Sequence, residues 1–186
     1  MNKHHLRLAA AAGLGAAAVA MIAACASNGH QPHSPVPLAS DIDLPRYMGA
    51  WYVIANIPTF AEKDARDAVE TYRLQDDGRV DIDFRFRKQD GGEGEMKRIG
   101  STGFVSKEDR AIWGVQFVWP IKADYRIAYV SPDYSQTIVA RDKRDHVWIM
   151  ARTPTLTDAQ YQVLLSRVAA MGYDKRKVRK VPQAAA

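Results

Sequence analysis

Cys25 is the residue best suited to covalent chemistry, and it is the only cysteine among the 186 residues of the chain. It follows an apolar, alanine-rich run over 8–22, and Lys3 and Arg7 precede that run. A positive segment, a short apolar segment and small residues before the cysteine are typical of an export signal. The run is too short and too rich in alanine to indicate a membrane-spanning helix, which needs about 20 strongly apolar residues.

The residues around Cys25 also resemble the lipobox of bacterial lipoproteins, since Ile22, Ala23 and Ala24 come directly before the cysteine. The resemblance implies that residues 1–24 are removed and that the Cys25 thiol carries a lipid anchor. A free thiol behind an ordinary secretory signal is the alternative. Ala26 rather than Asp follows the cysteine, which implies the outer membrane as address, with the domain in the periplasm. An acylated sulfur can neither form a disulfide nor act as a nucleophile.

The histidines give no pattern for catalysis or metal binding. His30 and His33 lie near each other, but no third ligand is close, and metals require three or four. His146 is the only histidine beyond residue 33, and no Ser-His-Asp spacing, G-x-S-x-G motif or glycine-rich phosphate loop accompanies it. We therefore expect no catalytic residue, no metal and no cofactor. A lipid-acting hydrolase or isomerase stays open as an alternative.

The charge of the chain is concentrated near its C-terminus. The formal net charge of +5 falls to +3 without residues 1–24, because Lys3 and Arg7 leave and no acidic residue does. Most of the surplus belongs to one cluster: Lys175, Arg176, Lys177, Arg179 and Lys180. We expect residues 175–186 to form a solvated basic tail, which could contact anionic lipid head groups. An exported chain excludes nucleic acid as a partner.

Composition divides the rest of the chain into a tether and one domain. Residues 25–41 contain three prolines, are otherwise mostly polar and show no apolar periodicity, so we expect an extended, flexible tether. Residues 42–174 have the usual length of a single domain with one core.

The pattern of the domain is that of β-strands. Over 80–87 every even residue is apolar and every odd one charged, which predicts one buried and one solvated face and places Asp81 and Asp83 outside, beside arginines. Asp77-Gly78 predicts a tight hairpin turn just before this strand. The eight predicted strands span 50–57, 68–74, 80–87, 98–105, 111–118, 125–131, 136–141 and 147–152. Short connections force antiparallel neighbours, so we predict an all-β, eight-stranded antiparallel up-and-down barrel.

One helix is expected after the strands. Thr157 and Gln160 have the spacing of a capping box. The apolar residues that follow at helical spacing are Tyr161, Leu164, Leu165 and Val168, and Gly172 provides a stop. Its single apolar stripe predicts that this helix packs on the outside of the barrel.

The motif RYMGAWY over 46–52 sits at the start of the first strand, and VWIMARTPT over 147–155 ends the last one. Together with TYRLQDDG over 71–78, these segments resemble the lipocalins, in particular bacterial outer-membrane lipocalins and the relatives of apolipoprotein D. The resemblance implies structural roles for Gly49, Trp51 and Arg152, with Trp51 closing the barrel floor and Arg152 packed across it. The family's middle motif has no clean copy, and 132–134 and 144–146 are partial candidates.

Alternation also predicts the side chains that point into the barrel and contact a ligand. They are Val80, Ile82, Phe84, Phe86, Thr102, Phe104, Trp113, Val115, Phe117, Tyr125, Ile127 and Tyr129. This aromatic lining suits an elongated apolar ligand with a polar end, and the resemblance implies a fatty acid or lysophospholipid. The alternative is a filled barrel that acts as a structural or interaction module, with an envelope partner or a second copy of the chain on its outer surface.

Overall fold

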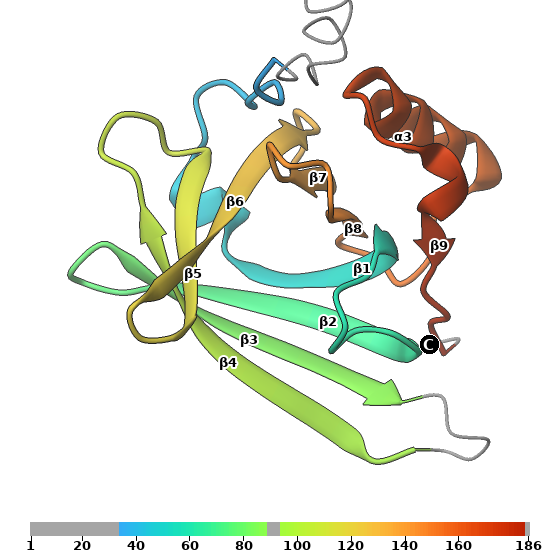
Figure 1. The fold of residues 1–186 in the computed structure, drawn as a ribbon, viewed down its shortest axis with the longest axis horizontal. Coiled ribbons are helices and arrows are strands. Elements are labelled where there is room, and N and C mark those ends of the chain that lie inside the picture. The colour runs from blue at the N-terminus through green and yellow to red at the C-terminus, as the bar shows by residue number, and fades with distance from the viewer. Residues whose placement is uncertain (1–33, 89–93, 185–186) are drawn as a thin grey trace, which may run out of the picture. The chain divides into compact units, whose positions relative to one another are not determined.

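The computed structural model describes residues 34–88 and 94–184. The strands are β1 Gly49–Ile57, β2 Ala65–Leu74, β3 Arg79–Lys88, β4 Met96–Val105, β5 Ile112–Val118, β6 Ile121–Val130, β7 Gln136–Ala140, β8 Val147–Ala151 and β9 Arg179–Lys180. The helices are α2 Leu44–Tyr47, α3 Asp158–Ala170 and the short 3-10 helix η2 Lys175–Lys177. Figure 1 shows the strands curling round a common axis with α3 beside them.

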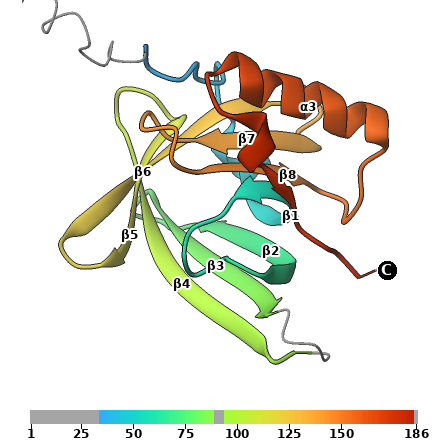
Figure 2. The ribbon, with the colours of Figure 1, turned by 45° about the vertical axis from the view of Figure 1, so that its right-hand side comes forward.

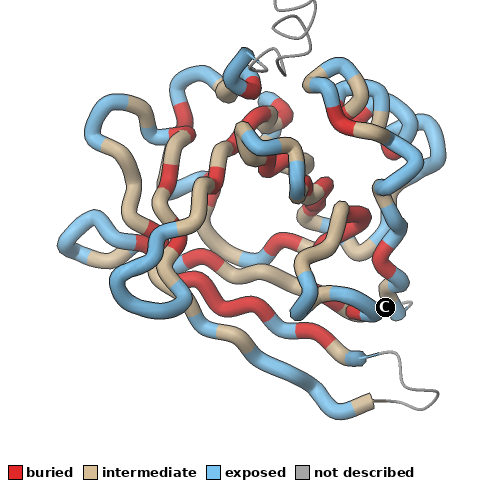
Figure 3. The backbone as a smooth tube through the Cα atoms, viewed as in Figure 1, coloured by how far each residue is buried: buried red, intermediate tan, exposed pale blue. Residues whose placement is uncertain are grey.

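The first eight strands form the closed antiparallel barrel that the sequence predicts. Each strand from β2 to β7 pairs with the next in sequence, and β1 pairs with both β8 and β2. This double pairing of β1 removes the free edges that an open sheet would expose. Figure 3, which looks along the same direction as Figure 1, shows the backbone as a ring whose wall carries most of the buried residues.

β3 illustrates why this sequence forms a barrel wall. Its even residues Val80, Ile82 and Phe86 are at most 3% exposed, whereas Asp81 on the opposite face is exposed. Asp83 departs from the expected solvated charge, because it is only 3% exposed. Its carboxylate contacts the guanidinium groups of Arg85 at 2.8 Å and Arg98 at 2.5 Å. Burial raises the pKa of a carboxyl group, but these two bonds outweigh it and lower the pKa of Asp83.

The helix α3 packs on the outer face of the barrel, as the sequence predicts (Figure 2). Its N-terminus has the predicted capping box, in which Gln160 N donates to Thr157 Oγ1 at 3.2 Å and Thr157 N donates to Gln160 Oε1 at 2.9 Å. The buried residues of the helix are Tyr161, Leu164 and Val168, which join outward-facing side chains of β7 and β8 in a second apolar cluster.

The two ends of the barrel differ, and the strand connections define them. The connections β1–β2, β3–β4, β5–β6 and β7–β8 lie at one end, which we call the mouth. The connections β2–β3, β4–β5 and β6–β7 lie at the other, which we call the closed end, and α2 runs beneath it. Because every neighbouring pair is antiparallel, this division follows directly from the topology.

The predicted tether over 25–41 is only partly correct. Residues 25–33 lie outside the described residues, but residues from 34 onward contact the barrel. Val36 is 2% exposed, and its N–H donates to the carboxylate of Asp142 at 2.8 Å. Ala39 N donates to Ile127 O at 2.9 Å. The apolar side chain of Val36, between two prolines, packs against the wall, so the predicted flexible tether is wrong for the described residues from 36 onward.

The predicted tail over 175–186 is solvated at its basic residues, which are all exposed, but from residue 179 it is not a free tail. Residues 179–184 lie along the mouth half of β1, where β1 no longer pairs with β2. Val181 N donates to Ile54 O at 2.9 Å, and Asp67 N donates to Pro182 O at 2.8 Å. The side-chain nitrogen of Gln183 donates to Val53 O of β1 and Ala68 O of β2. The segment therefore bridges the seam that these two strands leave.

Deleting residues 179–186 should destabilise the barrel, because it removes a buried valine and the backbone bonds across the seam. We expect the free energy of unfolding to fall by about 2–4 kcal/mol. Denaturant titration measures the change, and Lys175→Ala on exposed η2 is the control. A deletion variant as stable as the control would contradict a sealing role for this segment.

Candidate functional site

The side chain of Arg152, directly after β8, holds the closed end together. Its guanidinium carbon lies 3.7 Å from the centroid of the Trp51 ring, so the contact that the lipocalin resemblance implies is present. The same group donates to four backbone oxygens: Ala50 O at 2.8 Å, Arg46 O at 2.9 Å, Tyr47 O at 3.1 Å and Met48 O at 2.8 Å. One side chain thus joins β8, the start of β1 and the end of α2.

The residues before β1 are arranged to let Arg152 approach. Gly49 has a φ of 93°, which only glycine adopts without strain, and a Cβ atom there would lie 3.4 Å from Arg152 Nη1. Asp43 caps α2 by accepting from Arg46 N at 3.2 Å. The helix ends at Tyr47, whose carbonyl oxygen also accepts from Trp51 Nε1 at 2.8 Å.

Of the two partial copies of the middle motif, the one over 132–134 lies at the closed end. The Tyr134 hydroxyl accepts from Asp43 N at 2.9 Å, and the Tyr134 ring lies 4.2 Å from the guanidinium carbon of Arg46. Tyr134 O accepts from Arg152 Nε at 3.3 Å. The candidate over 144–146 belongs to the β7–β8 connection at the mouth. The 132–134 turn is therefore the segment that contributes to the Arg152 network.

Five aromatic side chains fill the barrel above Arg152, and we call them the aromatic floor: Tyr47, Trp51, Tyr72, Trp113 and Tyr125. The Trp113 and Tyr125 rings are stacked at 5.3 Å, and the Tyr72 and Trp113 rings meet edge to face at 5.6 Å. The hydroxyl oxygens of Tyr72 and Tyr125 are 2.5 Å apart. Burial raises the pKa of both phenols, so they stay neutral and act as hydrogen-bonding groups. The closed half of the barrel is therefore packed with protein.

Above the floor, the wall has side chains that face inward and still retain accessible surface. Ile99 and Ser101 of β4 pair with inward-facing Phe84 and Ile82 of β3, yet both are only partly buried. Trp148 of β8 packs against the interior cluster and is also partly buried. Trp51 and Trp113 of the floor, by contrast, are at most 1% exposed. A ligand inside the barrel would lie in front of these partly accessible side chains, between the floor and the mouth, and we call this region the chamber.

Glu70 of β2 is the ionisable side chain at the base of the chamber. It pairs with Trp51 on one side and Phe84 on the other, which directs it inward. Burial raises the pKa of Glu70 to about 7, a hydrogen bond from Tyr72 acts in the opposite direction, and the negative charge of Glu62 adds to the rise. The residue is partly buried. Near neutral pH, Glu70 is therefore divided between a neutral donor and an anion.

Eight of the twelve predicted lining residues do face the interior. They are Val80, Ile82, Phe84, Phe86, Trp113, Val115, Tyr125 and Ile127, all at most 8% exposed and all members of the interior cluster. Phe84 and Phe86, whose rings stack at 5.0 Å, lie toward the mouth. Trp113 and Tyr125 belong to the packed floor. Contact of any of these residues with a ligand stays a prediction.

The predicted inward orientation is wrong for Thr102 and Phe104. They pair with Asp81 and Arg79 on the outer face of β3, and Phe104 lies 3.5 Å from the Lys122 ammonium. The inward position between them is Gly103, where a Cβ atom would come within 3.2 Å of the Trp113 ring. A glycine fits at this inward position because the indole of Trp113 occupies the space that a side chain would need.

Two further predictions fail at irregularities in the sheet. A register shift between Ile127 and Tyr129 turns Tyr129 outward, where it packs in the α3 cluster with Arg167 at 4.2 Å from its ring. Phe117 is 59% exposed, because the β5–β6 hairpin changes register after Val115. Alternation counted along an unbroken strand cannot locate such shifts.

Glu70 is the functional candidate that sequence reasoning missed. In the stretch over 68–74, Val69 and Thr71 suit a buried face as well as Ala68 and Tyr72 do, so alternation left the position of Glu70 ambiguous. The signal that could have located it is Tyr72, the largest apolar residue of the stretch. Tyr72 is expected to face the interior, and Glu70, two residues earlier, lies on the same face of the strand.

The described residues offer little for other chemistry. Among them, no three His, Cys, Asp or Glu side chains are grouped to hold a metal ion. His146 lies at the mouth, with its Nδ1 3.2 Å from Ile57 O. A search of the same residues found no helix with the length and apolar character to cross a membrane.

A family model and individual relatives both assign the chain to one family. The family model of the lipocalin-like domain matches residues 42–183. The chain is 30% identical to the outer membrane lipoprotein Blc of Escherichia coli over 162 residues, which cover 87% of this chain and 90% of that protein. It is 30% identical to temperature-induced lipocalin-1 of Arabidopsis thaliana, covering 76% and 80% of the two chains. It is 31% identical to bovine apolipoprotein D, covering 69% of each.

Solved structures share the fold at lower identity. Insecticyanin from the tobacco hornworm Manduca sexta superposes with a TM-score of 0.60 at 14% identity, covering 80% of this chain and 84% of that one. The cockroach allergen Per a 4 gives a TM-score of 0.61 at 17% identity, with coverage of 83% and 97%. At these identities the likeness establishes the fold alone.

Replacement of Arg152 by Met should destabilise the closed end strongly, because it removes a donor from five backbone oxygens, of which Tyr47 O keeps another donor, Trp51 Nε1. We expect a loss of about 2–4 kcal/mol in the free energy of unfolding. Arg167→Met is the matched control, since it removes only a cation–π contact at the outer surface and should cost under about 1 kcal/mol. Thermal and denaturant unfolding compare the two, and equal losses would contradict the role assigned to Arg152.

Replacement of Glu70 by Gln should change how stability depends on pH. Between the ordinary pKa of 4.5 and the raised value of about 7, the unfolded chain has released the Glu70 proton while the folded chain keeps it. The free energy of unfolding therefore falls as pH rises through this window, by up to about 2 kcal/mol. Glu70→Gln should flatten that fall. Glu95→Gln, at an exposed carboxyl whose pKa Lys97 lowers, should leave it unchanged, and denaturation at a series of pH values tests both.

Proposed function

The chain belongs to the lipocalin-like family, and from this membership we propose that it binds one amphiphilic lipid in the chamber between the aromatic floor and the mouth. The supporting observation is the contrast along the barrel axis. Side chains of the floor have almost no accessible surface, whereas inward-facing residues nearer the mouth, such as Ile99 and Ser101, retain some. A barrel built only as a filled structural module would be packed equally at both levels.

The apolar part of the ligand is proposed to lie against the mouth half of the wall, where Phe84, Phe86 and Ile99 supply apolar surface. Burying an acyl chain of ~14 methylenes contributes roughly 11 kcal/mol before the costs of association and ordering are subtracted. That estimate is compatible with micromolar binding. A fatty acid and a lysophospholipid both supply such a chain.

Glu70 is proposed to select among polar ends. When neutral it can donate a hydrogen bond to a fatty acid carboxylate; when ionised it repels that carboxylate at short range. Among the described residues, the charged side chain that perturbs the pKa of Glu70 is the acidic Glu62, and no cation contributes. A zwitterionic lysophospholipid, with no net charge, should be less sensitive to this switch.

Location at the outer membrane through a lipid on Cys25 is part of the same proposal. It is supported by the lipobox-like residues before Cys25 and by similarity to proteins named outer membrane lipoproteins. Binding rather than catalysis is favoured because the hydroxyl group of Ser101, which faces the chamber, forms no hydrogen bond to a base among the described residues.

The decisive test is displacement of a fluorescent fatty acid, together with mass spectrometry of lipids extracted from the purified protein. We expect bound acyl lipid, and affinity for fatty acid that falls roughly tenfold between about pH 6 and about pH 8, because Glu70 ionises in that range. Glu70→Gln should remove most of this dependence. Lysophosphatidylethanolamine should bind with a much smaller pH effect.

Glu95→Gln is the matched control, since its exposed carboxyl group contacts Lys97 and is not among the groups that shift the pKa of Glu70. It should keep most of the pH dependence. Recovery of no lipid, together with no displacement at any pH, would show a filled barrel and refute the proposal.

A further inference from the structure

The mouth carries a group of exposed apolar side chains on two connections. Phe60, in the β1–β2 connection, is 96% exposed. The β5–β6 hairpin carries the others: Phe117 at 59%, Val118 at 69%, Trp119 at 82% and Ile121 at 72% exposed. We call these five residues the mouth patch. Both connections belong to the end of the barrel through which a ligand would enter.

Exposed apolar residues elsewhere on the described surface are isolated. Leu74, at the closed end, is 39% exposed, and Val163, on the outer side of α3, is 56% exposed. Scattered single residues of this kind are normal on soluble proteins, whereas several together mark a binding surface. Tryptophan with neighbouring aliphatic residues is typical of side chains at a membrane interface.

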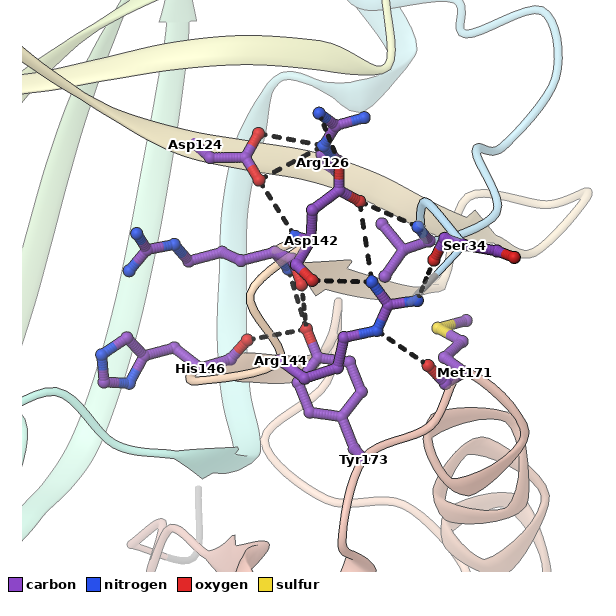
Figure 4. A network of polar contacts seen from close by, with 10 residues as sticks. Ser34, Asp124, Arg126, Asp142, Arg144, His146, Met171 and Tyr173 are labelled. Carbon is purple, nitrogen blue, oxygen red and sulfur yellow. Dashed lines mark hydrogen bonds and ion pairs between the residues drawn. The ribbon is translucent and has the colours of Figure 1, made fainter. Parts of the chain in front are cut away.

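The described chain begins at the same end of the barrel. Figure 4 shows Arg144 of the β7–β8 connection donating to Ser34 O at 2.6 Å and to Met171 O at 3.0 Å. Val36 is fixed to Asp142 of the same connection. That connection belongs to the mouth, where His146 contacts Ile57 at the end of β1. Any anchor upstream of Ser34 is thus tied to the mouth end.

We propose that the mouth patch docks onto the lipid bilayer that holds the Cys25 anchor, so that the chamber opens toward the membrane. The inference rests on the proposed function, which supplies the anchor. Eight residues lie between Cys25 and Ser34, and the nine steps from one residue to the next, at ~3.3 Å each, span at most about 30 Å. This length keeps the mouth end close to the bilayer.

A bilayer fits the mouth patch better than a protein partner does. The patch consists of two separate protrusions, and a fluid lipid surface can receive them without a complementary shape. Charges beside the patch are nearly balanced, since Lys63 precedes Asp64 and Lys97 contacts Glu95 at 2.7 Å. We therefore expect docking that depends on apolar burial and only weakly on salt concentration.

The test uses the full lipidated chain with one added cysteine that carries an environment-sensitive fluorophore. Val118→Cys and Ala61→Cys place the label beside Trp119 and Phe60 without removing either, while Leu74→Cys and Val163→Cys are the controls. The chains are reconstituted in vesicles of phosphatidylethanolamine with a minority of phosphatidylglycerol, with and without brominated acyl chains. Labels at 118 and 61 should shift to the blue and lose at least half of their emission to bromine; those at 74 and 163 should change little.

A second variant separates docking from tethering. Adding Phe60→Ser and Trp119→Ser to Val118→Cys should reduce the quenching several-fold, while the anchor stays in place. Equal quenching of the labels at 118, 61, 74 and 163 would overturn the proposal. A blue shift of the label at 118 that grows with protein density and is insensitive to bromine would also overturn it, because it would indicate contact with a second copy of the chain.

Failure of docking is distinguishable from failure of the proposed function. Two labels per chain by mass spectrometry would mean that Cys25 is free and that the anchor does not exist. Loss of fatty acid displacement in the same preparation would mean that the chamber binds no lipid. A singly labelled, ligand-binding chain whose label at 118 stays in water would refute docking alone.

Discussion

The fold depends most on the contact between Arg152 and the start of β1. One guanidinium satisfies four backbone oxygens around the end of α2 and covers the face of Trp51. Three of these oxygens belong to residues before β1, at the end of α2 and just after it, where the chain is not part of a strand. A planar donor with several N–H groups suits this arrangement, whereas a lysine ammonium would act as a single point. The contact therefore joins the first and last barrel strands at one end.

Closing one end in this way decides where an interior space can form. Within the aromatic floor Tyr47 packs on Trp51, and the hydroxyl groups of Tyr72 and Tyr125 form a hydrogen bond with each other. The mouth half of the wall has no such plug, and its seam between β1 and β2 is bridged by residues 179–184. Glu70 lies at the boundary between these regions, so its carboxyl group is largely desolvated yet still borders accessible space. The unusual titration of Glu70 is a consequence of that boundary.

The sequence predicts the architecture better than it predicts the lining. Strict alternation in β3, the capping box of α3 and the short connections are local signals, and each appears in the structure as expected. Errors arise where a distant contact decides the outcome. Thr102 and Phe104 face outward because Trp113, from another strand, requires Gly103 inside, and Tyr129 faces α3 because of a register shift. The basic residues over 175–180 predict a solvated tail, and only the neighbouring backbone of β1 explains why β9 forms.

The distribution of polar and apolar groups along the barrel axis gives the two ends different tasks. At the closed end, polar atoms are paired within the protein, and the described surface there carries Leu74 as an isolated apolar residue. At the mouth, large apolar side chains remain exposed. Arg144 and Asp142 fix the start of the described chain, which leads back to Cys25. Hydrogen bonds and the buried side chain of Val36, which belongs to the α3 cluster, hold that segment, so its attachment does not cover the mouth patch. The contacts that stabilise the fold and the surface proposed to contact lipid thus lie at opposite ends of the barrel. Substitutions at the mouth patch can therefore alter lipid contact without lowering the stability of the fold.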